Sequence, residues 1–267
     1  MSRISKFRPR EVTRRRRRLY TSRAVLYFSA GLALLVSLVL ISHMEALSIA
    51  TVSVVGEAAV GEGEMRELIA RELHGTYYKL FSKRNALIFP KRTIQKKLLA
   101  AFPALREAEV YLDRPTAISV YVAERKPYGI WCGNSEATLC FFIDDGGFAF
   151  APAPDITGSV FMRFYSEDEL FSSATYMPER FAELALFLER LGEVKLRPVT
   201  VRTADGDVRV RTDSGVEILV LEDQDFDAAF VTLISLFDKE TLQKDLRAAE
   251  LIDLRFENKV FYRPEPA

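Results

Sequence analysis

The chain has 267 residues, and its 37 basic side chains balance 37 acidic ones, so its formal net charge is zero. That total hides a split, because residues 1–23 hold ten Lys or Arg and one acid, Glu11, whereas the rest of the chain holds 27 basic and 36 acidic residues. The composition excludes collagen-like, coiled-coil and low-complexity proteins, and the basic end indicates contact with a nucleic acid or a membrane surface.

An uncharged segment follows the basic end. Residues 24–41 hold no charged side chain, and the uncharged stretch continues to residue 44. A helix needs about 20 mostly apolar residues to cross a hydrocarbon core of ~30 Å, so we expect a single transmembrane helix at residues 24–44. No second segment is long enough to span a bilayer, which argues against pores, transporters and outer-membrane barrels because each needs many spans.

An arginine run at the end of the basic segment predicts the orientation of that helix. Lys and Arg are retained on the cytoplasmic side, so we expect residues 1–23 to form a cytoplasmic tail and the rest of the chain to lie outside the cytoplasm. Alone, the run could also bind nucleic acid or serve as a nuclear signal. The apolar segment behind it favours contact with anionic lipid of the cytoplasmic (inner) membrane. The residues assigned to this role are Arg14, Arg15, Arg16, Arg17 and Arg18.

The same apolar segment has a second interpretation as a cleaved secretory signal. Ser48, Ile49 and Ala50 form a small-x-small site of the kind that signal peptidases cut. A signal's apolar region is usually about 7–15 residues long, and this one is longer and follows an unusually long basic lead. A permanent anchor is therefore the preferred interpretation, and both interpretations export the body of the chain.

The first exported domain is expected at residues 48–126. A β-branched strand at residues 49–56 ends at glycine. Helical spacing over residues 65–73 predicts a helix that Gly75 ends, and a second helix follows Pro90. Two alternating strands come next, so the order is β-α-α-β-β. Their expected inward-facing residues are Ala108, Val110, Leu112, Ile118, Val120 and Val122.

Residues 127–263 predict a mainly antiparallel β-domain with flanking helices, followed by a tail at residues 264–267. Helical patterns at residues 178–191 and 226–237 flank strands that glycine-containing turns separate. A short helix is expected near residues 242–249. A final hairpin is expected at residues 251–256 and 259–263. The aromatic stripe Phe226, Phe230 and Phe237 is expected in the core rather than in a ligand pocket.

Two cysteines flank a turn in this second region. Cys132 and Cys140 enclose seven residues, and they could face each other across a hairpin at the ~5.5–6 Å usual for bridged Cα atoms. The alternative is a pair of buried free thiols. An exported location favours the disulfide.

Several short motifs follow one another in a fixed order behind the membrane segment. They are Val54-Val55-Gly56, the run from Phe102 through Val110 to Pro115, Glu124-Arg125-Lys126-Pro127, Ile143 to Phe150, and Ile252-Asp253-Leu254-Arg255. Together they resemble the FtsQ (DivIB) family of bacterial cell division proteins. The resemblance implies an α+β fold in which a POTRA domain (β-α-α-β-β) precedes a β-domain. Two departures indicate a remote branch: the long connection at residues 76–89 and the Trp131-Cys132…Cys140 segment.

The resemblance also implies a function and a docking site. It implies a non-enzymatic, single-pass protein of the divisome that scaffolds other division proteins at the septum, with FtsB, the partner of FtsL, bound by the C-terminal β region. Independently, a terminal strand is expected at a sheet edge, where another chain can add a strand. The expected contact residues are Phe256, Lys259, Val260, Phe261 and Tyr262. The alternatives are an ordinary edge strand and, for the whole chain, a POTRA-bearing envelope-assembly or export factor.

Signatures of catalysis are sparse. The chain has two histidines, His43 and His74, and no nucleophile elbow, zinc-spaced Cys or His cluster, or glycine-rich phosphate loop. We therefore expect no catalytic residues, no metal, no cofactor, no small-molecule substrate and no nucleic acid.

Overall fold

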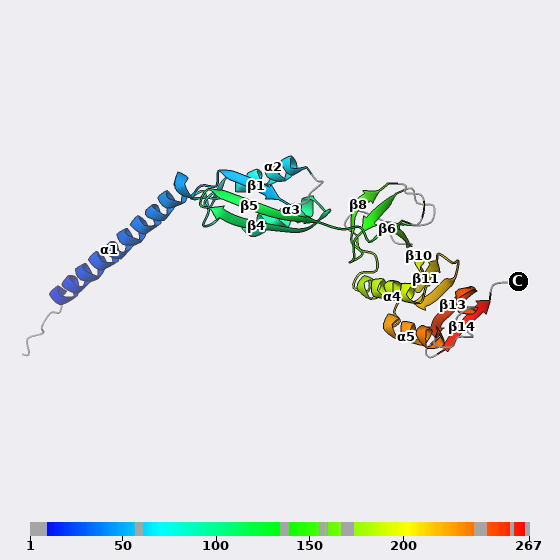
Figure 1. Ribbon diagram of the computed structural model, residues 1–267. Helices are drawn as coiled ribbons and strands as arrows, with labels where there is room; N and C mark the ends of the chain where they lie inside the picture. Colours follow the sequence, from blue (N-terminus) through cyan, green and yellow to red (C-terminus); the bar gives the residue numbers. More distant parts are fainter. Residues whose placement is uncertain are drawn as a thin grey trace, which may run out of the picture. The chain divides into compact units, whose positions relative to one another are not determined.

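The structure is a computed structural model that describes residues 10–56, 61–133, 139–154, 158, 160–166, 174–237, 245–256 and 259–264. Its contacts divide the chain into two compact units. The first comprises Met1–Leu98 and Glu107–Val122, and the second comprises Leu99–Arg106 and Ala123–Ala267. The fold is mixed α+β, with one long N-terminal helix, a three-stranded sheet and a nine-stranded sheet (Figure 1).

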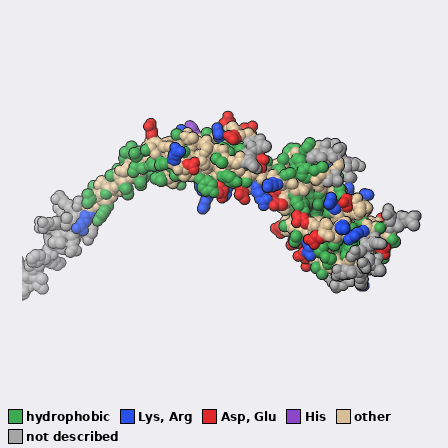
Figure 2. Space-filling model, viewed as in Figure 1, with side chains coloured by type: hydrophobic (Ala, Val, Ile, Leu, Met, Phe, Trp, Pro, Cys, Tyr) green, Lys and Arg blue, Asp and Glu red, His purple; other side chains and the backbone are tan. Residues whose placement is uncertain are grey.

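The N-terminal helix α1 spans Arg10–Ser42 and begins earlier than the sequence pattern suggested. Nothing between the arginine run and the apolar segment interrupts a helix, and Arg and Leu are good helix formers, so both segments join in one element. Within it, Arg23–Ser42 has a mean hydropathy of 2.5 and is long and apolar enough to cross a membrane. No other helix in the described ranges meets that test. Figure 2 shows hydrophobic side chains along this part of the helix.

The arginine run lies in the N-terminal part of α1. Arg14–Arg18 belong to the helix by backbone geometry, whereas their side chains are outside the described part of the structure. Their role in orientation therefore stays a prediction. The helix ends at Ser42, two residues before the expected limit, and a short 3-10 turn at Glu45–Leu47 leads to the first strand.

The first unit has the expected β-α-α-β-β order with a small hairpin inserted between its helices. Its three-stranded sheet has the order β1-β5-β4, and β1 runs parallel to β5, with Thr51 opposite Ala117 and Val55 opposite Tyr121. The central position of β5 agrees with its alternating buried residues Ile118, Val120 and Val122. The elements are β1 (Thr51–Val55), α2 (Glu62–Leu73), α3 (Lys91–Ala101), β4 (Leu105–Arg114) and β5 (Ala117–Glu124).

Strand β4 departs from the expected burial at one residue. Ala108 and Val110 are buried as expected, but Leu112 is 44% exposed. Alternation fixes which face of a strand a side chain occupies, whereas burial also requires an element that covers that face. Leu112 lies near the end of an edge strand, and the last four residues of β4 are all exposed.

The hairpin between the helices was not expected from the sequence. Strands β2 (Thr76–Tyr77) and β3 (Phe81–Ser82) pair antiparallel, and the turn residues Tyr78 and Lys79 have φ angles of 51° and 61°. Two consecutive positive φ angles are typical of a type I′ turn, which favours Asn-Gly or Gly-Gly. Because Tyr-Lys is a poor signal for that turn, the sequence of residues 76–89 predicts only a long connection between the helices.

The second unit contains a nine-stranded sheet of order β14-β13-β12-β11-β10-β9-β6-β7-β8. Five of its strand pairs are antiparallel, and the β12–β13, β9–β10 and β6–β9 pairs are parallel. The sheet is thus mainly antiparallel, as expected. Its strands are β6 (Gly129–Cys132), β7 (Cys140–Ile143), β8 (Ala149–Ala153), β9 (Met162–Tyr165), β10 (Pro198–Ala204), β11 (Asp207–Thr212), β12 (Glu217–Leu221), β13 (Ala249–Phe256) and β14 (Lys259–Pro264).

Two helices contribute to the core of this unit. Helix α4 (Phe181–Glu193) contacts α5 (Phe226–Phe237) and β10, and α5 contacts β13 and β14. Phe226, Phe230 and Phe237 are buried, which confirms that the aromatic stripe belongs to the core. The short helix expected near residues 242–249 falls partly outside the described ranges, and so does the tail beyond Pro264.

Candidate interaction edge

Strand β14 is the outermost strand at one end of the nine-stranded sheet, so the prediction that the last strand lies at an edge is confirmed. Its outer side has no neighbouring strand in the described structure. Apart from Val260, which packs partly against the core, the residues of β14 are exposed. Phe261 and Tyr262 are 56% and 41% exposed, so the edge strand presents two large aromatic side chains to solvent at consecutive positions.

Phe256 does not follow the expected alternation of β13. Alternation with Ile252 and Leu254, which are 0% and 2% exposed, would place Phe256 on the buried face, but it is 49% exposed, as a contact residue should be. The register between β13 and β14 shifts between Asp253 and Phe256, and such a bulge changes the face on which later side chains lie. As a result, Phe256 meets Phe261 edge to face, with 5.1 Å between ring centroids.

A charged network fixes the bulged end of β13. Arg255 donates from its backbone N–H and from Nε to Asp253 Oδ1, at 3.1 and 3.0 Å, and a third bond of 2.7 Å reaches Oδ2. Its other terminal nitrogen donates to Asp207 Oδ2 at 3.0 Å, which ties β13 to the start of β11. The hydrogen bond from Arg255 lowers the pKa of Asp253, and the hydrogen bond to Asp253 raises the pKa of Arg255.

Only half of this network was visible in the sequence. Asp253 and Arg255 belong to the Ile252–Arg255 motif on which the family resemblance partly rests. Asp207 belongs to none of the motifs, and nothing in the sequence links it to an arginine 48 residues away.

A shallow hollow adjoins the same end of β13. It has a volume of about 550 Å³, and Leu254, Arg255 and Phe256 form one side of it, while Ala228 and Thr232 of α5 belong to the other. Gln224 donates to the carbonyl oxygen of Leu254 at 2.8 Å and so holds the preceding loop against the strand. The exposed aromatic pair Phe256–Phe261 therefore lies beside a depression that a partner side chain could enter.

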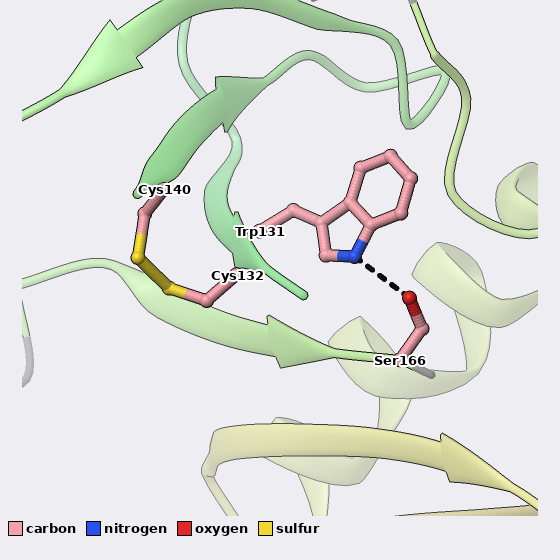
Figure 3. The surroundings of a disulfide bond; sticks show 4 residues. All are labelled: Trp131, Cys132, Cys140 and Ser166. Carbon is pink, nitrogen blue, oxygen red and sulfur yellow. Dashed lines mark hydrogen bonds between the residues drawn. A yellow bond between two sulfur atoms is a disulfide. The ribbon is translucent and has the colours of Figure 1, made fainter. Parts of the chain in front are cut away.

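The disulfide lies elsewhere in the same sheet. Cys132 of β6 and Cys140 of β7 occupy paired positions, with 4.4 Å between their Cα atoms, and their sulfur atoms are bonded (Figure 3). The neighbouring Trp131 is 2% exposed and donates from Nε1 to Ser166 Oγ at 3.0 Å. Trp131 and Cys132 are buried and Cys140 is half-buried. Strand β6 lies six strand positions from β14, so this site cannot contribute directly to contacts at that edge.

Two other motifs meet at one buried contact within the second unit. The Arg125 guanidinium forms an ion pair with Asp144, donates to the carbonyl oxygen of Pro103 at 3.1 Å and lies 4.3 Å from the centre of the Phe148 ring. Asp144 Oδ1 accepts the backbone N–H groups of Gly146 and Phe148, each at 2.9 Å. The Glu124–Pro127 and Ile143–Phe150 motifs thus build a structural clamp rather than an exposed contact site.

Gly147 is required in the turn of that clamp. Its φ angle is +77°, and a Cβ atom there would come within 2.7 Å of the Phe181 ring and 2.8 Å of the Tyr176 carbonyl oxygen. Both the backbone conformation and the close packing therefore exclude a side chain.

The described residues contain no group of three or more His, Cys, Asp or Glu side chains that could hold a metal ion. His43 Nε2 is hydrogen-bonded to the carbonyl oxygen of Leu80 at 2.9 Å, and His74 lies at the C-cap of α2. The structure does not bring the two histidines into a common site with a nucleophile, and the expectation that the protein is not an enzyme stays a prediction.

Comparisons with known proteins did not assign the chain to a family. No family model matches its sequence, and no curated protein is significantly similar to it. The likeness to the FtsQ family therefore rests on the motifs quoted above, and the chain's described fold is that of a mixed α+β protein with one N-terminal helix that could span a membrane.

Proposed function

We propose that the chain is a non-enzymatic, single-pass membrane protein that recruits other membrane-anchored division proteins at the septum, in the manner of the FtsQ family. The N-terminus lies in the cytoplasm, and both compact units lie outside it. The first unit corresponds to the POTRA domain of that family and the second to its β-domain. One observation carries the proposal: the terminal strand β14 forms an edge with an exposed aromatic surface, at the place where the resemblance predicts the docking of an FtsB-like partner.

Contacts around the end of α1 support a permanent anchor rather than a cleaved signal. Asn85, which is 2% exposed, donates to the Ser42 carbonyl oxygen at 3.2 Å. Cleavage after Ala50 would remove this partner together with the Ser48–Asn85 bridge, so the first unit would lose contacts that belong to its fold. The proposed cleavage site is itself part of the fold, since Ile49 is 1% exposed and the Ala50 N–H donates to the Thr116 carbonyl oxygen.

Strand addition explains how β14 would bind its partner. The backbone groups on the outer side of an edge strand can pair with an incoming strand, and the side chains on its faces then determine specificity. Phe256, Phe261 and Tyr262 supply aromatic surface beside the hollow, and aromatic residues are enriched among those that dominate binding energies. Lys259 adds a positive charge at the start of the strand, which suits an acidic segment in the partner.

Single prolines on β14 test this mode of binding. Phe261 and Tyr262 pair with consecutive residues of β13, Asp253 and Ile252, so one of their two N–H groups points outward and the other points toward β13. Proline removes the N–H. In a pull-down between the full chain and purified FtsB-like and FtsL-like proteins of the same organism, only the proline at the outward position should abolish binding while the fold is retained. Alanine at that position should weaken binding less.

Circular dichroism of each variant separates lost binding from lost folding. The proline at the inward-facing position breaks a bond to β13 and serves as the control for damage to the hairpin. If both proline variants fold and bind as tightly as the parent chain, β14 is not the docking strand. The anchor and the assignment of the first unit would be unaffected by that result.

A further inference from the structure

The segment between α2 and α3 holds the C-terminal end of the apolar helix. Besides the Asn85 bond, His43 Nε2 pairs with the Leu80 carbonyl oxygen at 2.9 Å, and the Ser82 N–H donates to Ser42 Oγ at 3.4 Å. The last carbonyl groups of a helix have no partners within it, and the Asn85 bond caps one of them from outside. The other two contacts fasten Ser42 and His43, at the end of α1, to the same segment. Both α1 and this segment belong to the first unit, and β3 contacts α1 directly.

This capping places the segment at a defined depth. The 20 residues Arg23–Ser42 form a helix about 30 Å long, which equals the thickness of a bilayer's hydrocarbon core. Ser42 then lies at the boundary between the acyl chains and the headgroups. The headgroup layer beyond that boundary is only about 5–7 Å thick on each side. A segment that bonds to Ser42 and His43 therefore starts within that layer.

The side chains that this segment exposes are those that favour a membrane interface. Tyr78 is 91% exposed, Leu87 is 72% exposed, and Leu80 and Ile88 are 43% and 41% exposed. Tyr is enriched at the level of the headgroups because one end of its ring is apolar and the other polar. Lys79, exposed at the tip of the turn, can extend its ammonium group to lipid phosphates.

The backbone of the turn strengthens this interpretation. Tyr78 and Lys79 adopt positive φ angles, which cost a residue with a side chain about 1–3 kcal/mol. Tyr78 gains no burial within the protein in return. A conformation that exposes a tyrosine at such a cost is explained if the ring is buried in a surface outside the protein.

We propose that residues 76–88, which comprise the β2–β3 hairpin and the six residues after it, form an interfacial hairpin. Its Tyr78, Leu80, Leu87 and Ile88 side chains insert among the lipid headgroups at the C-terminal end of α1. This inference rests on the proposed membrane anchorage, but it does not depend on the role in division. The hairpin and the helix give the first unit two attachments to the same membrane surface. Together they restrict how that unit can tilt, because a single helix followed by a short link would leave it free to do so.

Lipid-borne quenchers measure the insertion directly. The full chain is reconstituted into vesicles of phosphatidylethanolamine and phosphatidylglycerol, with or without doxyl-labelled lipid, and tryptophan fluorescence is recorded. Tyr78→Trp introduces the probe at the tip, and Leu87→Trp provides a second position. Trp131 is buried in the second unit and supplies a constant background that the parent chain measures. The fluorescence added by each new tryptophan should fall by at least about twofold in labelled vesicles.

Two matched variants serve as controls, one for an exposed position away from the membrane and one for a position within the apolar helix. Tyr121→Trp is the exposed control: Tyr121 is 48% exposed, and it pairs with Val55 at the far end of β1, about 20 Å along the strand from Ile49. It should be quenched little. Leu34→Trp lies within the apolar segment and should be quenched strongly if α1 spans the bilayer.

The probes together distinguish a failure of the interfacial hairpin from a failure of the membrane anchor. If Leu34→Trp is quenched but Tyr78→Trp and Leu87→Trp are quenched no more than Tyr121→Trp, the hairpin lies off the membrane and the inference fails while the anchor stands. Emission that is blue-shifted yet unquenched at position 78 would show that another protein surface covers the hairpin, which also overturns it. If Leu34→Trp is not quenched, membrane anchorage itself is refuted and the interfacial hairpin with it.

Discussion

Two hairpins of the nine-stranded sheet use similar residues for opposite purposes. In the β6–β7 hairpin all four residues of β6 are buried, β6 lies between β9 and β7, and a disulfide joins the two strands. In the β13–β14 hairpin the outer strand is exposed, and a ring contact between Phe256 and Phe261 and a charged network take the place of a covalent link. Aromatic side chains thus fill the core at one hairpin and face solvent at the other.

The β13–β14 hairpin shows how a protein can keep an exposed edge strand without promoting aggregation. Proteins protect edge strands with bulges, lysines and prolines, and the β13–β14 hairpin has a register shift, Lys259 at the start of β14 and Pro264 at its end. The middle of the strand, around Phe261 and Tyr262, remains open for pairing. The buried hairpin can then supply stability, while the edge is free to be optimised for binding.

The sharpest test of this division compares two aromatic truncations. Trp131→Ala removes a buried ring that packs edge to face on Tyr176, with ring centroids 5.4 Å apart, and also its hydrogen bond to Ser166. We expect it to lower the free energy of unfolding by about 3–5 kcal/mol. Phe261→Ala removes a half-exposed ring and should cost less than about 1 kcal/mol. Urea denaturation of the full chain in detergent, followed by far-ultraviolet circular dichroism, measures both.

The same pair of variants should behave inversely in binding. Phe261→Ala is expected to weaken capture of the FtsB-like partner, whereas any Trp131→Ala protein that remains folded should bind normally. Equal losses of stability in the two variants would contradict the separation of roles between the hairpins.

The disulfide should contribute a smaller amount to the stability of the buried hairpin. Cys132 and Cys140 are eight residues apart, and closing so short a loop in the unfolded chain is worth about 2–3 kcal/mol. Cys132→Ser with Cys140→Ser should therefore lower the unfolding free energy by that amount and leave partner binding at β14 unchanged. Parent protein that is alkylated after unfolding without reductant should not gain two labels, and the appearance of two labels would show that the thiols are free.

Local patterns in the sequence predicted much of this fold. The alternation of Ile118, Val120 and Val122 identified a buried strand, and the spacing of Phe226 and Phe230 identified a buried helical face. Such patterns depend only on the period of the element and on a water-excluding neighbour. These patterns failed where a covering element was missing or where the register shifted. Leu112 has no element over it, and the bulge before Phe256 turns that ring outward.

Long-range partners were beyond the reach of the sequence. Alternation does not encode which strand lies beside which, so the parallel pairs β12–β13 and β6–β9 could not be inferred from a series of hairpin signals. The candidate edge was anticipated because it follows from the position of the last strand in the chain. The network that shapes it was not, because Asp207 meets Arg255 only when β11, β12 and β13 assemble.

Asp253→Asn tests how far that network stabilises the exposed hairpin. The amide keeps an acceptor oxygen, and Arg255 keeps its bond to Asp207, so we expect a loss of only about 1–2 kcal/mol near neutral pH. The effect should depend on pH, because hydrogen bonding from Arg255 lowers the pKa of Asp253 from its ordinary value of 3.8. A carboxyl group with a lowered pKa stabilises the fold fully above that value, and the contribution is lost as the pH falls through the folded-state pKa.

Unfolding free energies measured from pH 7 down to pH 3 should therefore approach each other for the parent and the Asp253→Asn variant at the acid end of this range. The difference should be constant above about pH 5 and shrink below 3.8, since the unfolded parent then binds a proton at Asp253 that the folded parent binds only at lower pH. A difference that stays constant over the whole range would mean that the charge of Asp253 contributes nothing. In that case the neutral hydrogen bonds and the bulge alone would hold Phe256 against Phe261, and partner binding at β14 should not change over the same range of pH.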